Sequence, residues 1–466
     1  MDIQAKLDFI DFYKNASNAA TGSKFDANAN VASKNIATLQ TELGKKDIID
    51  LNRVITGSYI EKMFGKDLAE QYLKDLKHHI IYTHDESSLM PYCCSISLYP
   101  YLLSGLKELG GSSQPPKHAN SYIGGLINLV FLVAGQFAGA VAIPEFLTYF
   151  DHFLRIDYGE DYINHLDDVV ESVGEHKFNL RHKIEDWFQQ FVYSINQPAG
   201  ARNYQSPFTN IAYFDKYYFE HIFDGDFVFP DGDIPCWETT KELQKMFMKW
   251  FNAERLHGVL TFPVETANIL VENGKYKDEE MANFFAEMWA EGHSFFMYQS
   301  DSVDALASCC RLRNAVEDNS FSFSLGAGAI ETGSKRVCTL NINRIVQDWD
   351  KEGRKISLKD YVAAIEWRVH KYLRAWNQKL HDDFDAGILT VYKAGFIDLD
   401  KQFLTSGING FAEAAEYLGI TVDPNCEEYK QLAKDVLGTI KEINTQDRDE
   451  HHRWNTEFVP KSFVGI

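Results

Sequence analysis

The sequence of 466 residues is short of positive charge, with 46 lysines and arginines against 67 aspartates and glutamates. The formal net charge of −21 opposes non-specific binding to nucleic acid, because such binding needs Lys and Arg side chains that displace counterions. We therefore expect no nucleic-acid partner. A nucleotide ligand is still compatible with this charge, since a local pocket can be positive in an acidic protein.

The sequence also lacks several common site motifs. No two of its seven cysteines have the C-x-x-C spacing of a zinc ribbon, and an odd cysteine count in a long chain does not fit a secreted disulfide scaffold. Neither H-E-x-x-H nor G-x-S-x-G occurs, so a zinc protease and a serine hydrolase have no support. Residues 1–13 mix acidic and apolar side chains and do not form a signal peptide. We expect no metal site in this chain and a reducing cytoplasm around it.

Only one segment, residues 124–143, approaches the ~20 apolar residues that a membrane span needs. Asn128 and Gln136 interrupt it, basic flanks and interfacial tryptophans are missing, and Pro144 ends it. The pattern therefore favours a buried helix over a membrane span.

What the sequence has in plenty is aromatic residues, at 14%, which favour a large and well-filled core. Helical patterns alternate with short apolar runs, and this alternation predicts an α/β fold. We expect a helical lead-in over residues 1–80 and one catalytic domain over residues 81–466. The further helices are expected at 145–175, 237–257, 277–293, 358–382, 410–418 and 427–443, and the apolar runs at 94–98, 259–262, 295–298, 320–325, 337–342 and 387–392.

The cysteines are placed unusually, in two adjacent pairs. Cys93 and Cys94 follow a Pro-Tyr dipeptide, and Cys309 and Cys310 precede Arg311. A single free cysteine is most often a small buried hydrophobe. Two adjacent pairs beside turn or polar residues point instead to dithiol chemistry or to a reactive thiol. Both interpretations are compatible with the residues alone.

An ordered series of short motifs allows a more specific interpretation than the cysteines alone. Its members are Gln197-Pro-Ala-Gly-Ala-Arg202, Tyr204-Gln-Ser-Pro-Phe-Thr-Asn210, Leu260-Thr-Phe-Pro-Val-Glu-Thr266, Ser308-Cys-Cys-Arg-Leu312, Ser324-Leu-Gly-Ala-Gly328, Thr339-Leu-Asn-Ile-Asn-Arg344 and Gly407-Ile-Asn-Gly410. From about residue 25 to the last residue, this series resembles the catalytic domain of anaerobic (class III) ribonucleotide reductases.

The resemblance implies a ten-stranded α/β barrel of the glycyl-radical enzyme and ribonucleotide reductase type, with a central finger loop near residues 305–315. It also implies that Cys310, which directly precedes Arg311, is the reactive thiol. In this family a glycyl radical takes the hydrogen atom of the thiol. The resulting thiyl removes the 3′ hydrogen of a ribonucleoside triphosphate, and the 2′ hydroxyl leaves as water.

Further roles follow from the resemblance. A second catalytic cysteine would be Cys93 or Cys94, and Cys309 could join a reducing pair. The reductant would be formate or a redox protein, and the extra cysteines favour the redox protein. Glu265 would be either a pocket group or a buried partner of other side chains. The residues expected to bind the substrate are His84, Gln205, Ser206 and Asn341.

The chain also departs from the family pattern. The family continues into a four-cysteine zinc site and a glycyl-radical loop, and neither motif occurs in these 466 residues. We therefore expect the larger fragment of a split enzyme, with the zinc and the glycyl radical on a C-terminal fragment chain. A truncated gene product, acting as a catalytically inactive nucleotide-binding or regulatory remnant, is the alternative, and a formate-lyase type of glycyl-radical enzyme is another.

The resemblance finally implies a set of partners. We expect nucleotide effectors, a radical-SAM activase and a homodimer, with specificity control near the helix of residues 121–143. We expect no counterpart of the family's N-terminal ATP cone, because only ~25 residues precede the resemblance, which is too few for such a domain.

Overall fold

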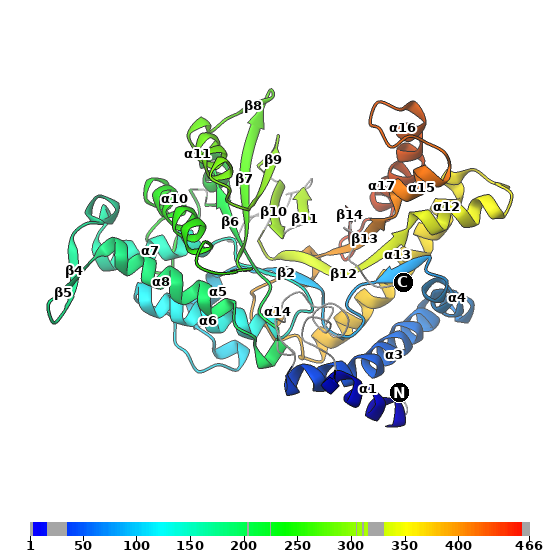
Figure 1. The fold of residues 1–466 in the computed structure, drawn as a ribbon, viewed down its shortest axis with the longest axis horizontal. Coiled ribbons are helices and arrows are strands. Elements are labelled where there is room, and N and C mark those ends of the chain that lie inside the picture. The colour runs from blue at the N-terminus through cyan, green and yellow to red at the C-terminus, as the bar shows by residue number, and fades with distance from the viewer. Residues whose placement is uncertain are drawn as a thin grey trace. The chain divides into compact units, whose positions relative to one another are not determined.

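The computed structural model describes residues 3–15, 35–202, 205–223, 225–303, 305–309, 312–315 and 330–458. The chain divides into two compact units, and Figure 1 shows the elements of both. The first unit consists of Met1–Cys93, Gly333–Leu389 and Leu399–Ile466, and the second of Cys94–Thr332 and Thr390–Asp398. A domain boundary at residue 80 stays a prediction.

Ten strands form one mixed sheet in the order β14-β13-β12-β2-β3-β6-β7-β8, with β1 beside β12 and β9 beside β7. Within it β12, β13 and β14 are parallel, as are β2, β3, β6, β7 and β9, whereas β1 and β8 pair antiparallel. Parallel neighbours need crossover connections, which explains why helices alternate with strands along the chain. The strands are β1 (Ile81–Thr83), β2 (Cys93–Ser95), β3 (Val141–Ala142), β6 (Thr209–Phe214), β7 (Val264–Glu272), β8 (Lys275–Tyr276), β9 (Phe296–Ser300), β12 (Thr332–Asn341), β13 (Phe403–Asn409) and β14 (Arg453–Phe458).

In the first unit, helices bury one apolar face of β12 and β13. Cys338 and Leu340 of β12 belong to a buried cluster with Val362, Ile365 and Val369 of α13. These α13 residues recur every three or four positions, the spacing of one helix face. The helices of this unit are α1 (Ile3–Asn15), α3 (Ile36–Phe64), α4 (Lys66–Lys77), α12 (Ile342–Lys351), α13 (Leu358–Asp385), α15 (Phe411–Tyr417), α16 (Glu427–Ala433) and α17 (Thr439–Gln446).

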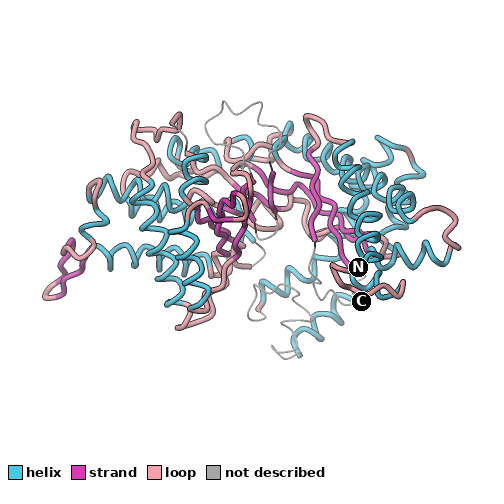
Figure 2. The backbone as a smooth tube through the Cα atoms, turned by 90° about the horizontal axis from the view of Figure 1, so that it is seen from above, coloured by secondary structure: helices cyan, strands magenta, loops and turns pink. Residues whose placement is uncertain are grey.

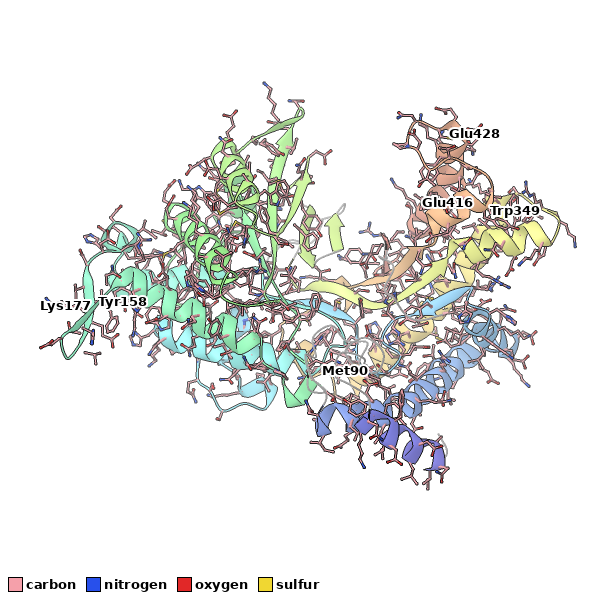
Figure 3. All side chains as sticks on the ribbon, viewed as in Figure 1. Met90, Tyr158, Lys177, Trp349, Glu416 and Glu428 are labelled. Atoms are coloured by element: carbon pink, nitrogen blue, oxygen red, sulfur yellow. The ribbon has the colours of Figure 1, made fainter. Side chains whose placement is uncertain are left out.

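Three of these helices lie together at one end of the first unit, where Figure 3 labels Trp349 on α12, Glu416 on α15 and Glu428 on α16. The Tyr417 hydroxyl donates a hydrogen bond to Asp350 Oδ2 over 2.9 Å and so ties α15 to α12. The buried apolar cluster of this unit includes residues of α12 and α15, namely Ile342, Ile345, Val346, Phe411, Ala414 and Ala415.

The core of the second unit is rich in aromatic rings. Phe146 of α7 contacts Phe191 of α8 and Phe247 of α10, with ring centroids 4.6 and 5.9 Å apart, and Phe188 contacts Phe247 over 4.8 Å. The helices of this unit are α5 (Tyr99–Ser104), α6 (Ala119–Ala134), α7 (Phe146–Tyr158), α8 (Leu180–Ile195), α9 (Lys216–Ile222), α10 (Trp237–Glu254), α11 (Glu279–Ala290) and α14 (Thr390–Lys393).

Two short hairpins complete the second unit. β4 (Val169–Val173) and β5 (His176–Asn179) pair antiparallel, and the ribbon projects away from α7 and α8 in Figures 1 and 2. β10 (Ala305–Cys309) and β11 (Leu312–Ala315) form the second antiparallel pair.

The apolar segment 124–143 is divided between helix α6 and strand β3. α6 ends at Ala134, and the backbone after it is held by Arg202. The guanidinium donates hydrogen bonds to the carbonyl oxygens of Ala134, Phe137, Ala138 and Gly139 over 2.7–3.3 Å. In the part of the chain that the structure describes, no helix is long and apolar enough to cross a membrane.

Several predicted elements differ in the structure. The helix expected over 145–175 ends at Tyr158, because Gly159 has φ +99°, and a strand follows at Val169. The run 387–392 is not a strand, since Gly387 at φ +79° ends α13 and a short helix begins at Thr390. The run 259–262 is a loop, and β7 begins just after it.

The turn that joins β2 to α5 depends on a buried carboxyl group. Glu145 Oε2 accepts a hydrogen bond from Leu98 N over 2.6 Å, and Oε1 accepts one from the Tyr149 hydroxyl over 3.0 Å. Burial nevertheless dominates and raises the pKa of the Glu145 carboxyl to about 7.

This raised pKa makes stability depend on pH. The unfolded chain ionises Glu145 near pH 4.5, whereas the folded chain does so near pH 7. The free energy of unfolding should therefore fall as the pH rises from about 4.5 to about 7, by about 3 kcal/mol from this group, and then level off. Denaturant titrations of the native chain and of Glu145→Gln across this range measure the difference, and parallel pH curves would contradict the assignment.

Candidate active site

One face of β6 and β7 is covered by helices. Ile211 of β6 lies opposite Glu265 of β7, and successive side chains of a strand point to opposite faces. Tyr213, on the same face as Ile211, contacts Phe247 of α10 and Phe285 of α11 over 6.5 and 6.4 Å between ring centroids. We call this the helix-covered face.

Glu265 is the charged centre of the helix-covered face. Its side chain is fully buried, and its Oε1 accepts a hydrogen bond from the Tyr213 hydroxyl. Its Oε2 lies 3.0 Å from Arg255 Nη1 and 2.8 Å from His293 Nε2. All three partners come from β6 and from the segments that follow α10 and α11. Of the two roles left open for Glu265, these contacts support that of a buried structural partner.

The opposite face of the same strands lies under β10, which contacts β3, β6, β7 and β9. A strand that touches four others crosses the face of a sheet and does not extend its edge. Since α10 and α11 occupy the helix-covered face, β10 must lie over the other one. Figure 1 shows β10 and β11 beside β7 and β9. We call this second surface the β10 face.

Two polar residues of the β10 face stand out. Ser95 lies opposite Ala142, and Ala142 lies opposite Asn210, so the three form one row across β2, β3 and β6. Ser95 is 0% and Asn210 1% exposed. Neither the Ser95 hydroxyl nor the Asn210 amide has a hydrogen-bond partner among the described residues.

The two cysteines of β2 point to different faces. Cys94 lies opposite Val141, and Val141 lies opposite Thr209, a row on the helix-covered face. Cys93 is two residues before Ser95 on β2, so the two side chains share one face of the strand. Both cysteines are buried.

In the first unit, His84 and Asn341 lie along β12. His84 Nε2 is 2.8 Å from the Thr339 hydroxyl, and the His84 backbone N–H donates to Val337 O over 3.0 Å. Thr339 and Asn341 are two residues apart and therefore share one face of the strand, opposite the apolar cluster. Asn341 Oδ1 also accepts from Arg344 N over 3.2 Å and caps α12.

In the second unit, Gln205 and Ser206 lie on a tightly bonded loop before β6. The backbone N–H of Ala199 donates to Gln205 O over 2.9 Å, and the N–H of Gln205 donates to Arg202 O over 3.1 Å. The Ser206 hydroxyl donates to Asn196 O over 3.2 Å. Arg202, which holds the end of α6, thereby also positions this loop.

Of the cysteine pair in the expected finger loop, Cys309 ends β10 and pairs with Leu312 of β11. Cys310 and Arg311 lie outside the described residues. The placement of the reactive thiol at Cys310 thus stays a prediction.

Sequence reasoning did not single out Ser95 or Asn210, although Asn210 closes the Gln-Ser-Pro-Phe-Thr-Asn motif. Their distinguishing property is burial without a partner, which has no signal in a sequence. Within the described ranges, no group of three His, Cys, Asp or Glu side chains could hold a metal ion.

Comparison with solved structures identifies the class of fold. The anaerobic ribonucleotide reductase from Thermotoga maritima with citrate in its active site has a TM-score of 0.80 at 28% identity, covering 98% of this chain and 80% of that one. The same enzyme in complex with dATP and CTP has a TM-score of 0.78 at 28% identity, covering 96% and 72%. The structure with dATP in the specificity site has a TM-score of 0.80 at 28% identity, covering 98% of this chain and 74% of that one. The predicted α/β fold of the ribonucleotide reductase type is confirmed.

The family follows from the sequence match. The family model of the anaerobic ribonucleoside-triphosphate reductases matches residues 45–462, and this chain belongs to that family. A search of curated protein sequences finds no match.

The network around Glu265 gives a stability prediction. Glu265→Ala would remove the carboxylate from the buried His293 and the partly buried Arg255, and we expect a loss of about 3–5 kcal/mol in the free energy of unfolding. Tyr213→Phe removes only one hydrogen bond to the same carboxylate and should cost about 1 kcal/mol. Urea unfolding of both variants measures the two losses, and equal losses would show that Glu265 is not the charged centre of this face.

Proposed function

We propose that this chain performs the ribonucleotide-reducing step of an anaerobic ribonucleoside-triphosphate reductase. The observation that carries the proposal is the family match over residues 45–462. The relative from Thermotoga maritima in complex with dATP and CTP supports a nucleotide effector and a ribonucleoside triphosphate substrate. The same family match favours the reductase over a formate-lyase type of enzyme.

In the proposed reaction Cys310 carries the thiyl. The thiyl removes the 3′ hydrogen of the ribose, the 2′ hydroxyl leaves as water, and the sugar takes up two electrons and two protons from the reductant. Cysteine suits this step because its S–H bond is weak enough to be broken and remade. Side chains that exclude water would protect the radical.

The second thiol of the proposal is Cys93. Support comes from the alternation along β2, because Cys93 shares its face with Ser95, whose row lies on the β10 face, whereas Cys94 belongs to the helix-covered face. Cys309 at the end of β10 would complete a set of thiols suited to a redox protein as reductant.

The substrate-binding residues of the proposal are those inferred from the sequence. His84 and Asn341 share a polar face of β12, which supports a role in contacting the nucleotide. Gln205 and Ser206 lie on the loop that Arg202 holds. The Ser206 hydroxyl already has a backbone partner, so its role would be to set the shape of the loop.

A glycyl radical, when present, would take the hydrogen atom of the thiol and so convert the thiol to a thiyl. These 466 residues hold no Arg-Val-Cys-Gly-Tyr type of loop, so the proposal places the glycine on another polypeptide segment. A radical-SAM activase would generate it, and a homodimer would bind the effectors.

Reconstitution tests this function. The chain is mixed anaerobically with a polypeptide that carries the radical-loop glycine, the activase, a reductant, CTP and dATP, and the deoxycytidine triphosphate formed is measured. We expect product with the native chain and none with Cys310→Ala, while the glycyl signal in electron paramagnetic resonance persists. Product from Cys310→Ala would refute the thiol assignment, and nucleotide binding without turnover would favour an inactive regulatory remnant.

The same assay separates the two cysteines of β2. Cys93→Ser should lower turnover by at least about 100-fold, because it removes a reacting thiol, whereas Cys94→Ser should retain most activity. The matched pair controls for the change of sulfur to oxygen at a buried site. The reverse order of activities would assign the second thiol to Cys94.

A further inference from the structure

The row Ser95–Ala142–Asn210 has two polar ends and a small centre. Neighbouring strands are about 4.8 Å apart, so the Cα atoms of Ser95 and Asn210 are roughly 10 Å apart. Their side chains stand roughly perpendicular to the sheet and cannot meet in a direct hydrogen bond. Ala142 is the residue between them in the row.

Burying the two polar ends of the row without hydrogen-bond partners costs free energy. A buried hydroxyl or amide without a partner costs about 1–3 kcal/mol, and such groups are rare unless water or a ligand satisfies them. Ser95 and Asn210 present three such atoms on one face of the second unit, namely one hydroxyl and both polar atoms of one amide. A pair of this kind is expected where a ligand completes the hydrogen bonding.

The distance argues against a single water molecule. One water with two hydrogen bonds of about 2.8 Å spans at most roughly 6 Å between its partners. Two neighbouring hydroxyl groups on one molecule, each with one hydrogen bond, span more and match the wider separation of the two ends.

The row also has no charge, since its members are Ser95, Ala142, Asn210 and, opposite Asn210, Val264. A phosphate would be recognised by a cation or by several N–H donors. Hydroxyl groups, which both donate and accept, are suited to a serine hydroxyl and a carboxamide. The chemistry of the row therefore fits a neutral diol.

We propose that Ser95 and Asn210 bind the 2′ and 3′ hydroxyls of the substrate ribose, one hydroxyl each. This inference rests on the proposed function, because it takes a ribonucleotide as the ligand. The row lies on the β10 face, and β10 ends at Cys309, directly before the proposed thiol. Ser95 and Asn210 would thus present the sugar with its reacting carbons toward that strand.

Equilibrium binding tests the proposal without turnover. Dissociation constants for CTP, 2′-deoxy-CTP and 3′-deoxy-CTP are measured on the full chain by calorimetry, with dATP saturating. We expect the native chain to prefer CTP over each deoxy analogue. Ser95→Ala should lose the preference for one hydroxyl by about threefold to tenfold, and Asn210→Leu the preference for the other.

Thr240→Val is the matched control. Thr240 is another fully buried hydroxyl without a partner among the described residues, but it belongs to α10. Its removal should leave all three dissociation constants unchanged. The melting temperature of Ser95→Ala should not fall, because no protein hydrogen bond is lost, and Asn210→Ala replaces Asn210→Leu if the larger side chain prevents folding.

The outcomes separate this inference from the function on which it rests. If both variants keep both preferences while the native chain binds CTP and turns over, the ribose assignment is wrong and the proposed function stands. If the native chain binds no nucleotide, both are wrong. A lower melting temperature for Ser95→Ala with unchanged preferences would identify a structural water network and overturn the proposal.

Discussion

Everything in this molecule depends on the alternation of side chains across its ten-stranded sheet. Because consecutive residues of a strand point to opposite faces, each strand can serve an apolar helical layer and a polar surface at once. In β12 the cluster with Cys338 and Leu340 meets the helices, while Thr339 and Asn341 point the other way. In β6 Tyr213 meets α10 and α11, while Asn210 lies on the β10 face. A shift of one residue in any register would exchange these roles.

Buried carboxyl groups show how strongly the surroundings decide the chemistry of one residue type. Glu265 has an arginine, a histidine and a tyrosine around it and serves as the charged centre of a packed face. Glu145 has only neutral donors, and burial raises its pKa to about 7. The first carboxyl group is compensated by opposite charge, whereas the second is stabilised most readily by keeping its proton.

The fold class could be predicted from the sequence because helical and apolar runs alternate and because the order of the motifs is specific. The positions of individual strands and the roles of individual residues were harder to predict. The run 387–392 has the composition of a strand, yet Gly387 ends α13 there, and β13 was not expected at all. The choice between Cys93 and Cys94 depends on which strands flank β2. The sequence does not reveal it, because all three residues of β2 are buried and show no alternation of apolar and polar side chains. Ser95 and Asn210 attract notice only once the absence of partners is visible.

Arg202 illustrates how one side chain can join distant parts of a chain. Its guanidinium donates hydrogen bonds to four carbonyl groups at and just after the end of α6, and its own carbonyl accepts one from Gln205 N. Because one guanidinium makes all four of these hydrogen bonds, loss of the Arg202 side chain removes them together. We therefore expect the end of α6 and the loop before β6 to open as one cooperative unit, although more than 60 residues separate them in the sequence.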